Sequence, residues 1–424
     1  MDIEVNYKNK KRYNNKWYPW HQTAFWRGVI WTLSKIALLG KEYTIEKNGM
    51  EDVKPPYMML SNHMHFIDFE LAAMGTGNHP VNNVVSIDGY VYRFFLLEWI
   101  GSIGTRKFTM DLHLVKAIRK VLQRGDVLSM YPEARYTPCG TLAFLPESLG
   151  KLIKMNKVPV VAVVHHGNHL YAPFWNFRNK RKVPMRTVFT KILTPEQIES
   201  MSVAEINETV KNALQYDEYR YQKDNGILIK EPFRAEGLHK VLYQCPHCGE
   251  EFQMDSKGAH IFCKACGKRW FWREDGYLEA EEGETEFDHI PDWFAWERQQ
   301  VQQQIERGEY SFCDEVEVYA LPRIYRFLPL GKAKLIHDPE KGFVLEGHYR
   351  GEDYYIQRLP AQTNSLHVEY DYVYTKKRDC VDISTENDSF YCVPTQENVI
   401  TKLGFATEIL YERSKTKRKE IQKV

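Results

Sequence analysis

Two Cys-x-x-Cys pairs are the feature that most constrains how this chain can fold. Cys245 and Cys248 form the first pair, Cys263 and Cys266 form the second, and a glycine directly follows each pair. Four thiolates at this spacing can close a tetrahedral metal site, and the glycines relieve the tight turn after each pair. We therefore predict a structural zinc ribbon over residues 238–280, with a redox pair or an iron centre as the alternatives. Four thiolate ligands leave no open position for catalysis at the metal.

The overall composition bounds the class of protein. With 424 residues, the chain should hold two or three domains. Only 8 of these residues are cysteines, and the four outside the pairs are scattered, which favours a reducing compartment over a disulfide framework. The net charge of +1 gives no argument for a nucleic-acid partner. Residues 250–262, between the two pairs, carry no basic surface, so we expect no nucleic acid there either.

Short apolar segments alternate with helical patterns in the first half of the chain. Buried strands that alternate with helices predict an α/β fold, with a mixed sheet flanked by helices, and we assign it to residues 46–235. Ser202 and Glu205 form a capping-box pattern that opens one of the helices. The predicted strands cover residues 57–60, 82–87, 127–131, 158–164 and 186–193.

The second half of the chain shows other patterns. Residues 285–310 include a Gln-rich polar segment that predicts a helical connector. Residues 311–424 alternate apolar and polar positions, as in "LHVEYDYVY" (366–374), which predicts a β-rich domain that ends in a helix at about 396–414. A pleckstrin-homology-like barrel and a small sandwich both fit this number of elements.

The segment "SNHMHFIDFE" (61–70) carries two interlocked histidine–carboxylate spacings. His63 stands five residues before Asp68, and His65 stands five residues before Glu70. Residues five apart on one helix point roughly 140° away from each other. Either spacing makes a pair only if the histidine lies in a loop and the carboxylate in the first turn of the next helix. A histidine oriented in this way by a carboxylate is a general base.

Three further segments place polar side chains beside the predicted strands. The segment "GSIGTRKF" (101–108) presents Arg106 and Lys107 after glycines, which predicts a turn with two cations. The segment "YPEARYTPCGT" (131–141) offers Glu133 and Arg135 in a loop, and the strand at 158–164 runs on into two histidines.

In their order and spacing, these four segments resemble the glycerolipid acyltransferases, most closely the 1-acylglycerol-3-phosphate acyltransferase family. The first motif of that family is Asn-His, four residues, Asp, which matches Asn62, His63 and Asp68, so the resemblance selects His63 over His65. The resemblance covers roughly residues 17–215. In the third motif, Arg135 lies one position earlier than the arginine of the family.

The resemblance implies an enzyme, an O-acyltransferase with a direct mechanism. Asp68 would fix the tautomer of His63, and His63 would take the proton from a lysophospholipid hydroxyl as it attacks the thioester of acyl-CoA or acyl-carrier protein. A Cys139 nucleophile with an acyl-enzyme intermediate is a rival route. A catalytically silent lipid- or protein-binding scaffold of the same fold is a rival function. The residues that would bind the substrate are Asn62, Arg106, Lys107, Glu133 and Arg135.

The N-terminal region, residues 1–45, suggests a membrane surface as a partner. Residues 7–16 are basic, and residues 17–39 combine four tryptophans with apolar residues at helical spacing. Because Arg27 and Lys35 interrupt this apolar pattern, the helix should lie in the membrane interface and not cross the bilayer. The alternative is an ordinary helix packed on its own domain. Without a signal peptide pattern, we expect a cytoplasmic protein held peripherally at the cytoplasmic membrane.

Overall fold

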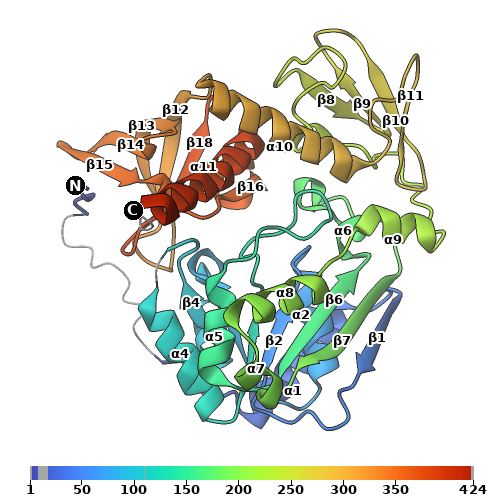
Figure 1. The fold of residues 1–424 in the computed structure, drawn as a ribbon, viewed down its shortest axis with the longest axis vertical. Coiled ribbons are helices and arrows are strands. Elements are labelled where there is room, and N and C mark those ends of the chain that lie inside the picture. The colour runs from blue at the N-terminus through green and yellow to red at the C-terminus, as the bar shows by residue number, and fades with distance from the viewer. Residues whose placement is uncertain (1, 8–17, 110, 422–424) are drawn as a thin grey trace. The chain divides into compact units, whose positions relative to one another are not determined.

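A computed structural model describes residues 2–7, 18–109 and 111–421 of the chain (Figure 1). The predicted basic segment at 7–16 therefore lies almost entirely outside the described residues. The described residues form two compact units, which we call the α/β unit and the C-terminal unit. The α/β unit comprises Asn14–Thr105 and Asp111–Lys230.

The α/β unit is built on one mixed sheet. Its strands are β1 (Tyr43–Asn48), β2 (Met58–Ser61), β3 (Val81–Ser86), β4 (Ile103–Thr105), β5 (Val127–Met130), β6 (Val160–His166) and β7 (Met185–Leu193). Among the described residues they lie in the order β1-β7-β6-β2-β5-β3-β4. The pairs are parallel except β6 with β7, which is antiparallel. All five predicted strands are confirmed, and β1 and β4 are additions.

Nine α-helices accompany these strands in the part of the α/β unit that the structure describes. They are α1 (Ala24–Ala37), α2 (Ile67–Thr76), α3 (Phe94–Trp99), α4 (Leu112–Gln123), α5 (Ser148–Asn156), α6 (Asn168–Tyr171), α7 (Pro195–Ser200), α8 (Val203–Ala213) and α9 (Glu218–Asp224). The predicted capping box is confirmed, because Ser202 and Glu205 each bond the other's backbone N–H at the start of α8.

Helices cover both faces of the sheet (Figure 1). Successive side chains of a strand point to opposite faces, so Leu60 and Met59 of β2 belong to different core clusters. Leu60 packs in a cluster with residues of α4, α5 and α8, whereas Met59 packs in a cluster with Ala72 of α2. Gly75 brings α2 close to β7, because a Cβ atom at this position would stand 2.2 Å from the ring of Phe189.

This topology brings three loops to one edge of the sheet. The parallel strands β5, β2 and β6 are neighbours, and their carboxyl ends point the same way. The loops that follow Met130, Ser61 and His166 therefore meet at that edge. Ligands of open α/β sheets bind in this kind of position.

The C-terminal unit comprises Met1–Tyr13, Arg106–Met110 and Glu231–Val424. Its small sheet contains β8 (Met254–Lys257), β9 (His260–Cys263), β10 (Arg269–Trp272) and β11 (Leu278–Ala280). Its larger sheet contains β12 (Phe312–Ala320), β13 (Leu328–Asp338), β14 (Gly342–Tyr349), β15 (Glu352–Arg358), β16 (His367–Tyr372), β17 (Arg378–Ser384) and β18 (Ser389–Pro394). These seven described strands form one continuous antiparallel sheet in the order β15-β14-β13-β12-β18-β17-β16.

Two helices pack within the C-terminal unit. They are α10 (Ile290–Arg307) and α11 (Ile400–Ile421), and α11 extends beyond the predicted 396–414. The helix predicted for the Gln-rich segment is present as α10, and one of its faces is buried. Val301 and Ile305 of α10 form a buried cluster with Phe405 and Ile409 of α11. The glutamines occupy the other side of an amphipathic helix, so composition alone concealed its buried face.

The described helices give no candidate for a membrane span, because none is both long and apolar enough.

Candidate active site and metal centre

His63 and Asp68 have the geometry that the spacing predicts. His63 lies in the loop after β2, Asp68 lies in the first turn of α2, and His63 Nδ1 is 3.1 Å from Asp68 Oδ2. His65 does not form the rival pair, because its Nδ1 accepts the backbone N–H of Ile67 at 3.1 Å. Burial lowers the pKa of His65 to about 4, which makes it a neutral residue at physiological pH. The structure therefore pairs His63, and not His65, with a carboxylate.

Asp68 is fully buried and accepts hydrogen bonds on both carboxylate oxygens. Oδ2 also accepts the backbone N–H groups of Met64, at 2.7 Å, and His65, at 3.0 Å. Oδ1 accepts a bond of 2.7 Å from Asn168 Nδ2. Burial alone would raise the pKa of Asp68, but the bonds from His63 and Asn168 and the nearby histidines lower it to about 2. An ionised Asp68 favours the proton on Nδ1 of His63, which makes Nε2 the basic nitrogen.

Asn62 and Glu133 hold the loops around His63. Asn62 is buried, and its side chain exchanges two hydrogen bonds with the backbone of His165, at 3.0 and 2.8 Å. Glu133 is buried as well, and it accepts the backbone N–H groups of His63, at 3.0 Å, and Ala143, at 2.8 Å. Burial raises the pKa of Glu133 to about 8, although these two bonds act in the opposite direction. Both predicted substrate-binding side chains therefore support the backbone of the site.

Two tyrosines that the sequence analysis did not select flank His63. The ring centroid of Tyr131 is 3.8 Å from that of His63, with 19° between the planes. The centroid of Tyr136 is 4.1 Å from that of His63, at 38°. Asn168 was also missed. All three residues could have been identified from their position, because they follow the ends of β5 and β6, the two neighbours of β2.

The predicted cations belong to different units of the chain. Arg135 belongs to the loop after β5, and it is largely buried, with 8% of its surface exposed. Arg106 and Lys107 belong to the C-terminal unit. There Lys107 Nζ lies 2.5 Å from His367 Nε2, and this nitrogen is 3.1 Å from Glu369 Oε1.

The surroundings of Cys139 disfavour the thiolate that a nucleophile requires. This residue is 3% exposed, and its Sγ lies 3.2 Å from the hydroxyl oxygen of Thr141. Burial raises the pKa of its thiol to about 12, so the reactive thiolate is scarce at neutral pH. If the chain has the acyltransferase activity that its motifs predict, Cys139→Ser should keep the rate within about a factor of two, whereas loss of a nucleophile would abolish it. A steady-state assay of both proteins checks this, and inactivation by Cys139→Ser in a folded protein would support the acyl-enzyme route.

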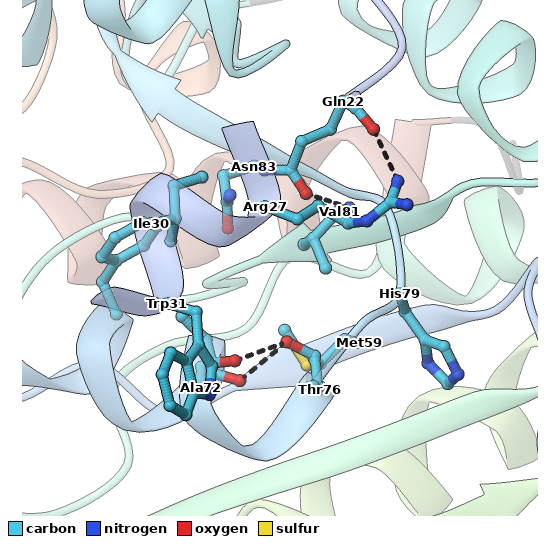
Figure 2. Close-up of a pocket in the computed structure, with 13 residues that line it drawn as sticks. Gln22, Arg27, Ile30, Trp31, Met59, Ala72, Thr76, His79, Val81 and Asn83 are labelled. Atoms are coloured by element: carbon cyan, nitrogen blue, oxygen red, sulfur yellow. Dashed lines mark hydrogen bonds between the residues drawn. The ribbon is translucent and has the colours of Figure 1, made fainter. Parts of the chain in front are cut away.

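A separate pocket lies between α1 and α2 (Figure 2). Ile30 and Trp31 of α1 and Phe69 of α2 supply part of its apolar lining, and Arg27 and His79 add polar groups. None of its lining residues belongs to the set predicted for catalysis or substrate binding.

The four paired cysteines form a metal centre in the C-terminal unit. Their Sγ atoms all lie within 4.8 Å of one another. The two turns that carry them are alike: Gly249 donates its N–H to the carbonyl of Cys245, and Gly267 donates to that of Cys263, both at 2.9 Å. Both glycines have positive φ values, +82° and +78°, which other residues rarely adopt.

Comparisons with known proteins agree with this metal centre. Residues 238–274 match the zinc-ribbon family described as DNA directed RNA polymerase, 7 kDa subunit. Among solved structures, a weak similarity relates the chain to the 1-acyl-sn-glycerophosphate (LPA) acyltransferase PlsC from Thermotoga maritima. The identity is 14% over 44% of this chain and 77% of that chain, with a TM-score of 0.36. No curated protein sequence matches the chain. Residues 238–274 are a zinc ribbon in which Cys245, Cys248, Cys263 and Cys266 bind structural zinc.

Proposed function

We propose that the α/β unit is an O-acyltransferase that moves a fatty acyl chain from acyl-CoA or acyl-carrier protein to the hydroxyl of a lysophospholipid. The observation that carries this proposal is the contact of His63 Nδ1 with the buried Asp68, which makes Nε2 of His63 a base. The motif resemblance supplies the substrate class.

The proposed reaction is a single displacement. Nε2 of His63 takes the hydroxyl proton while the hydroxyl oxygen attacks the thioester carbonyl. The C–S bond then breaks, and the thiolate leaves with the proton that His63 returns. A positioned general base contributes roughly 10²–10⁴ to such a rate. The ionised Asp68 stabilises the imidazolium that forms in between.

The acceptor is proposed to be similar to lysophosphatidic acid. Of the residues assigned to its phosphate, Arg135 shares the loop of Glu133 and offers a guanidinium, whose fork suits phosphate oxygens. Arg106 and Lys107 stay proposed phosphate ligands on the motif resemblance alone. Mass spectrometry of lipids formed by the purified full chain, given mixed acyl donors and lyso-acceptors, tests the acceptor. Absence of any acylated product would favour the silent scaffold.

We further propose that α1 and α3 lie in the membrane interface, where a lyso-acceptor resides. Within α1, whose residues are all described, Ser34 is the one buried residue. The apolar residues instead face outward: Phe25 is 69% exposed, Leu33 52% and Ile36 57%. A helix that packed only on its own domain would bury these side chains.

Helix α3 adds to this aromatic surface. Trp99 of α3 stacks on Trp26 of α1 with 5.3 Å between ring centroids. Phe95 is 65% and Trp99 45% exposed. Lys35 lies 5.0 Å from the ring of Trp31, where its ammonium group can meet an anionic headgroup. Aromatic and aliphatic side chains with basic residues beside them suit a bilayer surface.

We expect Leu33→Glu/Ile36→Glu to lose most of its binding to liposomes that contain anionic lipid. The exposed positions should tolerate the charge in the folded protein, and two glutamates oppose both the apolar and the electrostatic contribution. Added salt should weaken binding of the unmodified chain only in part, because salt does not screen the apolar contribution. Co-sedimentation at low and high salt measures both effects.

The matched control is Met155→Glu/Leu228→Glu, which changes two residues of the α/β unit that are 46% and 52% exposed. This variant should sediment like the unmodified protein. If both double variants bind alike, the membrane contact does not involve α1.

A further inference from the structure

We propose that Tyr131 and Tyr136 are positioning residues that clamp the His63 ring between their faces and favour its protonated form during proton transfer. The catalytic part of this inference rests on the proposed function. The effect of the two tyrosines on the protonation of His63 does not depend on the proposed reaction, and it can be tested without turnover.

The geometry is that of a ring held on two sides. Tyr131 is nearly parallel to the imidazole, with 19° between the planes and 3.8 Å between the centroids. Tyr136 packs at 4.1 Å and 38°. The side chain of His63 keeps 20% of its surface exposed. The two rings restrict rotation about χ2, and substrates must therefore approach the imidazole along its edge.

The clamp is anchored to its surroundings. Tyr131 directly follows β5, and Tyr136 packs on Phe174 with 4.9 Å between ring centroids. The backbone of the same loop is tied to His63 in two places: Thr137 donates its N–H to the His63 carbonyl at 2.8 Å, and Glu133 accepts the His63 N–H at 3.0 Å. The tyrosines are therefore held in register with His63 by bonds that do not involve the imidazole.

Besides the charged and titratable groups near His63, the two tyrosine rings can stabilise its imidazolium form. From α2, Asp68 faces Nδ1, and its pKa of about 2 keeps it ionised above pH 4. His65 and, from β6, His165 also interact electrostatically with His63, but burial lowers the pKa of each to about 4 and keeps both neutral. From the loop after β5, Glu133 contacts the backbone N–H. An imidazolium also gains from the negative faces of aromatic rings within about 6 Å.

The test measures the pKa of His63 directly. Histidine labelled with ¹³C in the full chain gives one resonance for each of its 15 histidines, and His63→Gln assigns the relevant one. Tyr131→Phe and Tyr136→Phe should keep the pKa of His63, because phenylalanine preserves an aromatic face. Tyr131→Leu and Tyr136→Leu should each lower it by about half a unit, the equivalent of one cation–π contact.

The same substitutions should change the kinetics. A lower pKa keeps His63 neutral down to a lower pH, so the acid limb of kcat/KM should move to lower pH by the same half unit. The plateau of kcat should fall in the leucine variants and recover in the phenylalanine variants, because only the latter restore the clamp. If a leucine variant fails to fold, methionine at the same position serves instead.

Tyr171→Leu is the matched control. Tyr171 forms a T-shaped contact with the neighbouring His65, at 5.7 Å and 85°, and not with His63, so its loss should leave the pKa of His63 unchanged. Equal pKa values in the leucine and phenylalanine variants, or a rise in the leucine variants, would overturn the clamp. A shifted pKa in a chain without acyl-transfer activity would keep the clamp and reject the proposed function. Activity without the shift would do the reverse.

Discussion

Replacing His63 by alanine should reduce acyl transfer by roughly 10²–10⁴, the contribution of a positioned general base. Replacing His65 by alanine should keep most of the activity. The physical reason is the different bonding of the two rings: His63 Nδ1 contacts Asp68 at 3.1 Å, whereas His65 Nδ1 caps the N–H of Ile67. Initial rates with an acyl-CoA donor and a lysophospholipid acceptor, at saturating concentrations, measure the effect.

Two controls make the His63 result specific. Asp68→Asn should also lose activity, because an amide cannot stabilise the imidazolium by charge, and its fold can be checked by thermal unfolding. His65→Ala reports any general disturbance of the loop, since the backbone N–H of residue 65 still reaches Asp68. Equal losses in the two alanine variants would contradict the assignment of His63 as the base.

Cys245→Ser should lose the zinc ion and unfold the ribbon, a far larger effect on stability than on the chemistry of the α/β unit. Metal analysis of the unmodified chain, purified without added metal, should find about one zinc per chain. In small zinc-finger peptides the metal supplies about 10–16 kcal/mol, whereas a surface substitution usually changes stability by less than about 0.5 kcal/mol. Hydrogen exchange should show faster exchange across residues 238–274 while β2 and β6 keep their protection.

The control is Cys313→Ser, which changes an exposed cysteine of the same unit. It should keep the zinc and the stability of the ribbon. A metal content in Cys245→Ser equal to that of the control, or a disulfide in place of the metal under reducing conditions, would contradict the zinc assignment.

The sequence alone determined the features whose cause is local. The five predicted strands are present as β2, β3, β5, β6 and β7. The apolar runs of β2 and β6 are typical of strands buried on both faces. The spacing of His63 to Asp68 required a loop followed by a helix start, and the turn before α2 meets that requirement. The two cysteine pairs close through turns whose glycines the sequence already contains.

Elements without a local pattern were not predictable. The strand β1, "YTIEKN", is half-exposed and largely polar, and it becomes a strand through parallel hydrogen bonds to β7. The strand β4 has three residues, fewer than any periodicity can reveal. The apolar pattern of residues 17–39 predicted a helix, which α1 confirms, but it could not show that these apolar side chains would face outward.

Only the tertiary structure decided which side chains surround His63. Asn168 lies 100 residues from the carboxylate to which it donates, and Tyr131 and Tyr136 come from the loop after β5, the strand on the other side of β2. It also assigned Lys107 to the C-terminal unit, where His367 lies beside it 260 positions away. Local periodicity reports which face of an element is buried, whereas these contacts depend on strand order and register. Both are settled by packing between residues far apart in the chain.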